Sequence, residues 1–290
     1  MGLIEAIVLG IVQGLTEFLP ISSTAHLRIL PALLGWSDPG ASFTAVIQLG
    51  TLGAVLVYFR SELASALGAW GRSLGDASLR KTPEGRLGWA IFWGTIPIVI
   101  LGVLFKSSIE NELRSLEIIA WSLIGMGLLL GVADRVAAGT RGEHEATVRD
   151  GVWVGLWQCI ALIPGASRSG STITGALLGG FDRAAAARFS FLLSVPSVFA
   201  AGVFSLKEHA GALGGQWMAV AVATAVSFVV GYASIAFLLR YLQTRGLWPF
   251  VLYRVALGVA ILALLSSGTL RPDTGLPPAE GAVVATGHQP

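Results

Sequence analysis

Residues 20–26 read Pro-Ile-Ser-Ser-Thr-Ala-His, and they interrupt an apolar run that otherwise extends from residue 2 to residue 35. The flanks are as apolar as a membrane-spanning helix, but the centre is polar and contains a proline. Irregular backbone at membrane depth is tolerated only where protein buries it or water fills a cavity. We therefore expect residues 2–35 to form two short helices joined by a polar turn, as a re-entrant hairpin.

A second stretch has the same plan. The apolar run 151–182 is broken by Pro-Gly-Ala-Ser-Arg-Ser-Gly-Ser-Thr at residues 164–172, which predicts a second re-entrant hairpin. The two stretches resemble each other at a constant offset of 144 residues, which places Ser23 against Ser167. Chance similarity among small apolar residues is the alternative to an internal duplication. The same number of apolar spans follows each hairpin, which favours the duplication.

Composition assigns the chain to the membrane. Only 12% of the 290 residues are charged, 54% are apolar, and the mean hydropathy is +0.73. A soluble domain carries roughly 25% charged residues, so the excess apolar surface here must face lipid. We expect an all-α integral membrane protein with six transmembrane helices and two re-entrant helical hairpins. The spans are expected near residues 43–60, 87–105, 117–133, 187–206, 217–239 and 249–266.

The expected topology is a single membrane domain over residues 1–267, built from inverted-topology repeats of about 1–134 and 151–267. Each half crosses the membrane an odd number of times, which inverts the second half. In this arrangement most Lys and Arg residues of the loops lie on one side, which the positive-inside rule assigns to the cytoplasm. The hairpins then enter from opposite sides, and their tips can meet. Residues 268–290 are predicted to be a disordered tail, because this end is rich in Pro, Gly and Ala.

The first polar constellation lies in and after the first predicted helix. Gln13 and Glu17 are four residues apart, on one helix face. A carboxylate and an amide oxygen one turn apart can hold part of a Mg²⁺ site, which usually takes one or two carboxylates plus substrate phosphates. The alternative for Glu17 is a hydrated helix-end group at the membrane interface.

A hydroxyl and an imidazole follow closely. Ser23 and His26 can act as nucleophile and base. His26 can equally protonate a leaving oxygen, or be a hydrogen-bonded core residue or metal ligand.

The second constellation is the more specific one. Arg168 lies among four hydroxyl residues, with no acidic residue nearby in sequence, and its planar fork suits bidentate binding of phosphate. A helix is expected to begin near Ser171, where free backbone N–H groups can hold an anion. A snorkelling Arg beside a Ser-rich helix cap is the alternative.

If the two tips meet, phosphate-binding groups from one hairpin face acid–base and metal-binding groups from the other. Such a site indicates hydrolysis or transfer of a phosphoryl group on a membrane-anchored pyrophosphate. The rival function is a lipid-phosphate transporter or flippase, because inverted repeats with broken helices are also the plan of many transporters. Ser23, His26 and Glu17 favour the enzyme, since a transporter needs no nucleophile or acid–base pair. The net charge of +2 is too small to indicate a nucleic-acid partner.

At these motifs the chain resembles the undecaprenyl-pyrophosphate phosphatase family of the bacitracin-resistance type. The family carries a Glu/Gln-xxx-Glu motif, matched by Gln13 to Glu17, and a Ser-Ser-Thr-x-His motif, matched by residues 22–26. Its third motif, Pro-Gly-x-Ser-Arg-Ser-x-x-Thr, is matched in full by residues 164–172. Residues 47–50 and the pair at 253–254 also look like family positions.

The resemblance implies a metal-dependent hydrolase that converts undecaprenyl pyrophosphate to undecaprenyl phosphate and recycles this lipid carrier for peptidoglycan synthesis. It implies a divalent cation, Mg or Ca, held by Gln13 and Glu17, although Gln13 stands where other members have Glu. It also implies a bacterial inner-membrane location among membrane lipid, with the pocket facing the periplasm. A homodimer is compatible with the sequence. The catalytic residues implied are Glu17, Ser23, His26 and Arg168, and the substrate-binding residues are Ser167, Arg168, Ser169 and Thr172.

Overall fold

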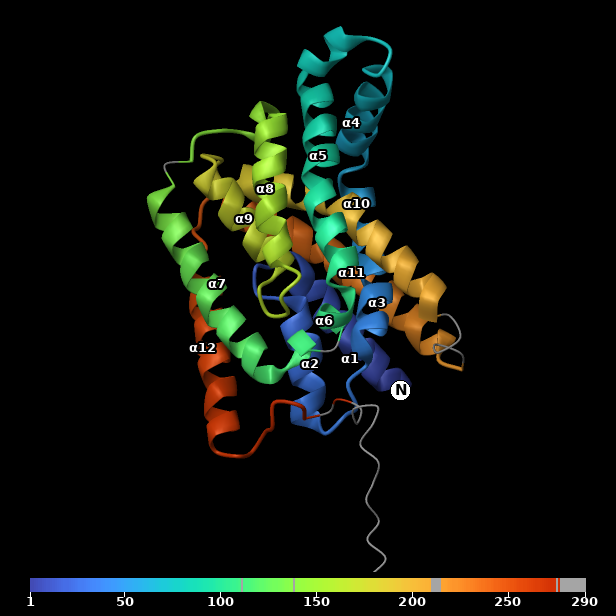
Figure 1. Ribbon diagram of the computed structural model, residues 1–290, viewed down its shortest axis with the longest axis vertical. Coiled ribbons are helices and arrows are strands. Elements are labelled where there is room, and N and C mark those ends of the chain that lie inside the picture. The colour runs from blue at the N-terminus through green and yellow to red at the C-terminus, as the bar shows by residue number, and fades with distance from the viewer. Residues whose placement is uncertain (111, 138, 210–214, 275, 277–290) are drawn as a thin grey trace, which may run out of the picture.

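The computed structural model describes residues 1–276 except 111, 138, 210–214 and 275, and within these residues it contains no β-strand (Figure 1). The predicted all-α class is therefore confirmed. The α-helices are α1 Leu3–Phe18, α2 Ser23–Leu34, α3 Gly40–Tyr58, α4 Arg60–Arg72, α5 Pro83–Leu104, α6 Lys106–Glu110, α7 Leu116–Val136, α8 Val148–Ile160, α9 Arg168–Leu178, α10 Arg183–His209, α11 Trp217–Leu242 and α12 Trp248–Ser266.

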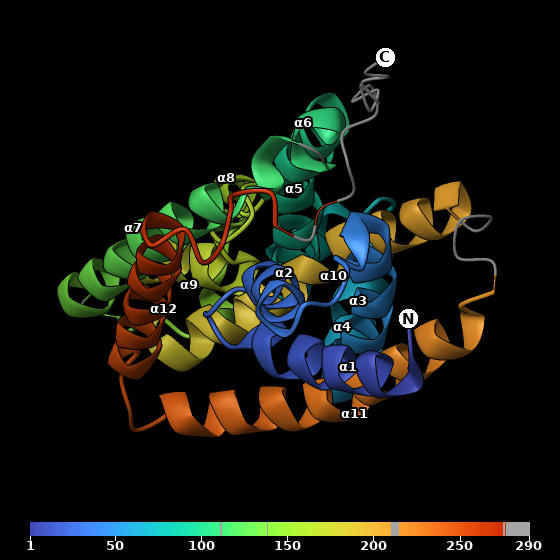
Figure 2. The same ribbon diagram turned by 90° about the horizontal axis from the view of Figure 1, so that it is seen from below.

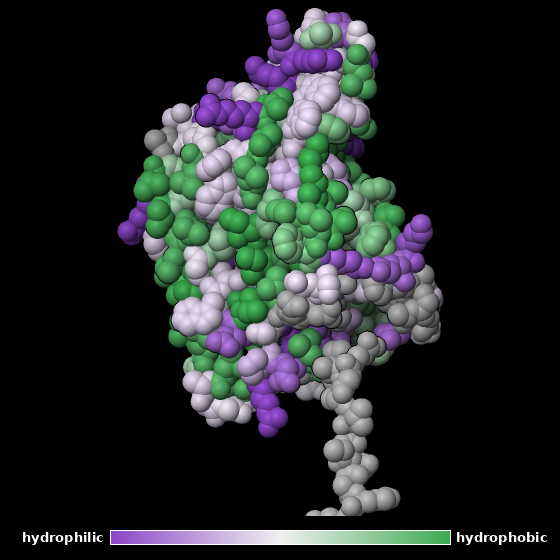
Figure 3. Space-filling view, viewed as in Figure 1, coloured by the Kyte–Doolittle hydropathy of each residue, from purple (hydrophilic) through white to green (hydrophobic). Residues whose placement is uncertain are grey.

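The predicted spans correspond to long apolar helices. Among the described residues, α5, α7, α10, α11 and α12 are each long and apolar enough to cross a membrane. Helix α3 supplies a sixth span when it is counted with α4, although the axis bends by 83° between them. Helix α4 lies within what the sequence predicts to be an inner loop. The surface agrees with a membrane location: apolar side chains cover the middle of the face in Figure 3, and hydrophilic ones gather at its two ends.

Two helix pairs take the place of the predicted hairpins. Helices α1 and α2 are separated at residues 19–22, and α8 and α9 at residues 161–167, which are the polar interruptions seen in the sequence. We call these two breaks the hairpin tips. The helices of each pair have at most 16 residues, too few to span about 30 Å of hydrocarbon. The second tip contacts the start of α2, because the backbone N–H of Gly165 donates to Oγ1 of Thr24 at 3.4 Å.

Each hairpin packs against a span of the opposite half. Helix α1 lies along α11, and α8 lies along α5 (Figures 1 and 2). Glycine allows both approaches: a Cβ on Gly10 would lie 2.6 Å from the carbonyl oxygen of Ala223, and one on Gly155 would lie 2.2 Å from that of Gly94. This reciprocal exchange supports the inverted repeat, which stays a prediction.

The structural correspondence of the tips differs by one residue from the sequence offset. Ser22 and Ser167 have positive φ angles of 75° and 71°, and both are the N-caps of the second helix of their hairpin. Ser22 is therefore the counterpart of Ser167, in place of Ser23. The sequence comparison aligned the prolines, whereas the backbone equivalence follows the helix starts.

Part of the tail that we predict from residue 268 packs against the rest of the protein. Residues 268–274 fold back across the start of α7, where the N–H of Leu116 donates to the carbonyl oxygen of Pro272 at 3.0 Å. Leu270 is buried in an apolar cluster that includes Ile29 of α2. One leucine in a Pro- and Gly-rich segment is enough to anchor it here, which composition does not reveal. The remainder of the predicted tail, residue 275 and residues 277–290, lies outside the described residues.

Candidate active site

A cavity of about 150 Å³ lies where the two hairpin tips meet α3, α5 and α10. Its wall is polar on the hairpin side and mostly apolar on the side of α5 and α10. The sequence-predicted residues Glu17, Ser23, Ser167 and Arg168 all line it. The complete wall consists of Glu17, Ser22, Ser23, Thr24, Gln48, Ile98, Ala161, Ser167, Arg168, Ser197, Val198 and Ala201.

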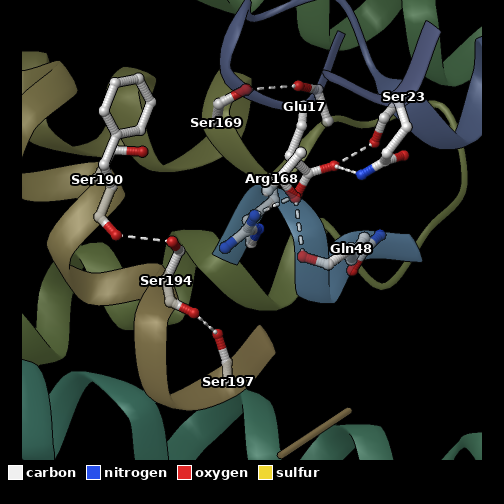
Figure 4. A network of polar contacts seen from close by, with 12 residues as sticks. Glu17, Ser23, Gln48, Arg168, Ser169, Ser190, Ser194 and Ser197 are labelled. Carbon is white, nitrogen blue, oxygen red and sulfur yellow. Dashed lines mark hydrogen bonds and ion pairs between the residues drawn. The ribbon is translucent and has the colours of Figure 1, made fainter. Parts of the chain in front are cut away.

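The carboxylate of Glu17 is the centre of the polar wall. It lies in the last turn of α1 and its side chain is only 3% exposed. Its Oε2 accepts hydrogen bonds from Oγ of Ser23 at 2.6 Å and from Nε2 of Gln13 at 2.8 Å. Its Oε1 is ion-paired with Arg168 of the second hairpin (Figure 4). Glu17 thus connects a hydroxyl on one hairpin to a guanidinium on the other.

The strained N-caps explain why Ser23 and Arg168 point into this site. A non-glycine residue with positive φ costs about 1–3 kcal/mol, and both Ser22 and Ser167 adopt it. Each offsets part of this cost by capping its helix: Oγ of Ser167 accepts from the N–H of Gly170 at 3.1 Å, and Oγ of Ser22 accepts from that of Ala25 at 3.4 Å. The sharp turns bring the N-termini of α2 and α9 to the cavity, where their backbone dipoles favour an anion.

Arg168 retains donor capacity beyond its ion pair. Its side chain is 17% exposed, and its Nη1 has no hydrogen-bond partner within the part of the chain that the structure describes. A buried guanidinium N–H without an acceptor is costly, so this nitrogen is suited to an oxygen of a bound phosphate.

Two predicted substrate-binding residues do not line the cavity. Oγ of Ser169 donates to the carbonyl oxygen of Leu19 at 3.2 Å, which ties α9 to the first tip. Oγ1 of Thr172 donates to the carbonyl oxygen of Arg168 at 2.7 Å and lies 2.5 Å from Oγ of Ser190, fully buried. In this structure both hydroxyls hold the second hairpin in place, and only Ser167 and Arg168 of this motif reach the cavity.

His26 does not line the cavity either. Its Nδ1 lies 2.7 Å from the carbonyl oxygen of Ser22, and its Nε2 lies 2.7 Å from the hydroxyl of Tyr253 on α12, with the two rings stacked. A carbonyl oxygen can only accept, so in the neutral ring Nδ1 donates and Tyr253 donates to Nε2. The predicted partnership of Ser23 with His26 is therefore not formed here, and Ser23 pairs with Glu17.

Arg254 holds the two tips together from behind. It is completely buried, and its guanidinium donates to the carbonyl oxygens of Pro20 at 3.1 Å, Gly165 at 3.0 Å and Ala166 at 2.9 Å. Its Nε also donates to the carbonyl oxygen of Leu123 on α7 at 3.2 Å. Tip carbonyls that no helix satisfies are thus satisfied by one side chain of α12.

Gln48 and Ser197 are site residues that the sequence reasoning missed. Gln48 lies on α3 within a segment that resembles the family, and Ser197 follows a proline in α10. Both are polar residues inside predicted spans, which is the signal that could have identified them. Both line the cavity together with Glu17, and the positions of the three side chains can be seen in Figure 4.

The two predicted cation ligands, Gln13 and Glu17, are hydrogen-bonded to each other, and of the two only Glu17 lines the cavity. Gln13 is fully buried, and its Oε1 has no partner among the described residues, so it is a candidate ligand beside the Glu17 carboxylate. No group of three or more His, Cys, Asp or Glu side chains gathers at a point within the described chain. One carboxylate with one amide oxygen fits Mg²⁺ better than a metal held by protein alone.

The sequence has close relatives of known family. The family model described as "Bacitracin resistance protein BacA" matches residues 6–260. Undecaprenyl-diphosphatase 2 of Frankia casuarinae is 52% identical, over 96% of this chain and 100% of that protein. The undecaprenyl-diphosphatase of Thermobifida fusca is 50% identical, over 95% of this chain and 94% of its own length. That of Myxococcus xanthus is 53% identical, over 95% and 93% respectively.

Proposed function

The chain belongs to the bacitracin resistance protein BacA family, and from this we propose that it removes one phosphate from undecaprenyl pyrophosphate in a membrane. The products are undecaprenyl phosphate and inorganic phosphate, and the reaction recycles the lipid carrier for peptidoglycan synthesis. The observation that carries the proposal is the cluster of Ser23, Glu17 and Arg168, which joins a hydroxyl, a carboxylate and a guanidinium at one cavity.

The cavity has two chemically different walls that match the two parts of such a substrate. The pyrophosphate fits between the N-termini of α2 and α9, where Arg168 and the hydroxyl of Ser167 face it. The apolar wall of Ile98, Val198 and Ala201 fits the start of a prenyl chain. Ala201 is exposed on the surface of α10, so this wall continues to the side of the protein that faces lipid.

In the proposed mechanism Ser23 is the nucleophile and Glu17 is its base. The Ser23 oxygen attacks the terminal phosphorus while its proton passes to Oε2 of Glu17, to which it already donates at 2.6 Å. The bond from that phosphorus to the bridging oxygen breaks, and undecaprenyl phosphate leaves. Water then cleaves the phosphoserine, with Glu17 again handling the proton. Arg168 stabilises the charge on the transferring phosphoryl group.

We propose that Gln13 and Glu17 hold a divalent cation, Mg or Ca. The orphaned Oε1 of Gln13 supports this assignment. When bound, the cation would neutralise charge on the pyrophosphate oxygens. We also propose a bacterial inner-membrane location with the cavity open to the periplasm, which the distribution of loop Lys and Arg residues supports.

The test is phosphate release by the purified protein in neutral detergent. Undecaprenyl and farnesyl pyrophosphates are supplied with Mg²⁺, with Ca²⁺ and with chelator. We expect release from both substrates and its loss with chelator. Release that survives chelator removes the metal proposal and leaves the phosphatase. If pyrophosphate binds tightly and no phosphate is released, the polyprenyl-phosphate transporter becomes the better account.

A further inference from the structure

Arg28 on α2 is a buried arginine that the proposed reaction does not use. Its side chain is 2% exposed, and none of its three nitrogens has a hydrogen-bond partner within the described residues. Its closest acidic contact is with Asp38, from Nε to Oδ2, at 3.8 Å, which is an ion pair and too long for a hydrogen bond. Five N–H donors are therefore enclosed in protein with no acceptor among the residues that the structure describes.

Asp38 is already used by a second arginine. Nη2 of Arg114 donates to its two carboxylate oxygens at 2.8 and 2.6 Å, and the N–H of Gly40 donates to Oδ1 at 3.1 Å. Asp273, in the segment after α12, is close enough to act on the charge of Arg28 but makes no ion pair with it. Two guanidinium groups thus contact one carboxylate, which accepts hydrogen bonds from Arg114 and from the N–H of Gly40. The N–H groups of Arg28 are the ones left without an acceptor among the described residues.

A buried charge with unsatisfied N–H donors destabilises the protein unless an anion or a carboxylate accepts their hydrogen bonds. The fork of Arg28 suits two oxygens of one tetrahedral anion, and the exposed edge of Arg114 lies on the same carboxylate.

The position of Arg28 connects it to the active site. Thr24 lines the cavity, and Arg28 lies one helical turn further along the same face of α2. Helix α2 runs from the cavity to the end of the molecule where α7 begins, which is the side that the sequence assigns to the outside (Figure 1). The arginine pair is therefore placed between the cavity and the outer aqueous face.

We propose that Arg28 and Arg114 form a second anion site that receives inorganic phosphate. The binding of phosphate stands on the arginine geometry alone. The identification of this phosphate as the product on its way out rests on the proposed function. In that setting the site draws phosphate away from Arg168 and limits its return to the cavity.

The test separates the two sites by working in an Arg168→Ala background. Thermal midpoints are measured in neutral detergent against rising inorganic phosphate, with chloride at matched ionic strength. We expect a rise of about 5 °C at a hundredfold excess over the dissociation constant. Adding Arg28→Met abolishes the rise. The matched control Arg60→Met, which removes an exposed arginine of α4, leaves it intact.

Arg28→Met without phosphate and a second variant, Arg28→Lys, serve as controls. Without phosphate, Arg28→Met folds with an unchanged or higher midpoint, because a buried charge with unsatisfied N–H donors is removed. Arg28→Lys keeps the charge but loses the fork, and we expect at least about tenfold weaker phosphate binding. In the otherwise wild-type protein, Arg28→Met strengthens inhibition by phosphate about tenfold, because the product is no longer drawn away from Arg168, while KM for farnesyl pyrophosphate stays within twofold.

Some outcomes would overturn the proposal. An equal phosphate response with and without Arg28 removes the site. A midpoint that rises in nanodiscs with phosphatidylglycerol, compared with phosphatidylcholine, while phosphate has no effect, assigns the arginines to a lipid headgroup. A drop in the midpoint of Arg28→Met without phosphate makes Arg28 a structural partner of Asp38. If no variant hydrolyses pyrophosphate but the phosphate response follows Arg28, the binding site stands and the proposed function fails.

Discussion

The guanidinium of Arg168, at the start of α9, forms an ion pair with the carboxylate of Glu17, near the end of α1. The two residues are 151 positions apart, and their contact joins the two hairpins at the cavity. In the proposed mechanism, a pyrophosphate that binds Arg168 would compete with Glu17 for the guanidinium. Substrate binding would then free the carboxylate beside Ser23, which would couple proton transfer to phosphate binding.

The first prediction concerns the nucleophile. Ser23→Ala removes the hydroxyl that donates to Glu17, and we expect phosphate release to fall by about a thousandfold or more. Acid quenching during turnover of labelled farnesyl pyrophosphate should trap a phosphoserine in the wild type only. The matched control is Ser171→Ala, a buried hydroxyl of the second hairpin that does not line the cavity. If Ser23→Ala keeps a tenth of the activity, water is the attacking group.

The second prediction concerns Arg254 as the brace behind the tips. Arg254→Gln leaves several tip carbonyls without a donor, and we expect a loss of at least about 3 kcal/mol in stability. The thermal midpoint in detergent measures it. Arg135→Gln on α7, whose guanidinium stacks on Trp248 at the surface, is the control and should change little. An equal response of the two variants would contradict the bracing role.

The third prediction concerns the pair of His26 and Tyr253. Tyr253→Phe removes the hydroxyl that holds His26 against the carbonyl oxygen of Ser22, next to Ser23, and leaves the stacked ring. We expect about a tenfold loss in kcat with little change in KM, because Ser23 is then less well positioned. The two residues should act as a unit, so Tyr253→Phe should have no further effect in a His26→Ala background. If the losses in kcat of the two single variants multiply in the double variant, the hydrogen bond between His26 and Tyr253 is not the cause of either loss.

The fourth prediction concerns the close packing of α8 on α5. A Cβ at Gly155 would lie 2.2 Å from the carbonyl oxygen of Gly94, so Gly155→Ala should lower the thermal midpoint by several degrees. Gly125 on α7 has open space at the same position, and Gly125→Ala should be neutral or stabilising by up to about 1 kcal/mol. Equal thermal midpoints for the two variants would contradict the close packing of α8 on α5.

The local part of this structure could be predicted from the sequence. A polar turn inside an apolar run predicted both hairpins, because unsatisfied backbone is not stable against lipid. Glu17, Ser23 and Arg168 were expected in one site, and the tips do bring them to one cavity. These inferences needed only short-range pattern and the topology that follows from it.

The tertiary part could not be predicted in the same way. The side chain of His26 meets Tyr253, 227 residues away, and the sequence does not show which face of α2 packs on α12. Gln48 and Ser197 were missed because a membrane helix is apolar on its lipid side and on its packed side, so periodicity does not identify the face towards a cavity. Ser169 and Thr172 matched a family motif, but a motif does not distinguish a residue that binds substrate from one that holds the turn.

The measurement that tests the central claim most directly is a double-mutant cycle on Glu17 and Arg168. Phosphate release from undecaprenyl pyrophosphate is measured for the wild type, Glu17→Gln, Arg168→Met and the double variant. One site shared by both hairpins predicts a loss of about a thousandfold in each single variant and no larger loss in the double. Losses that multiply, or a single variant that retains a tenth of the activity, would contradict it.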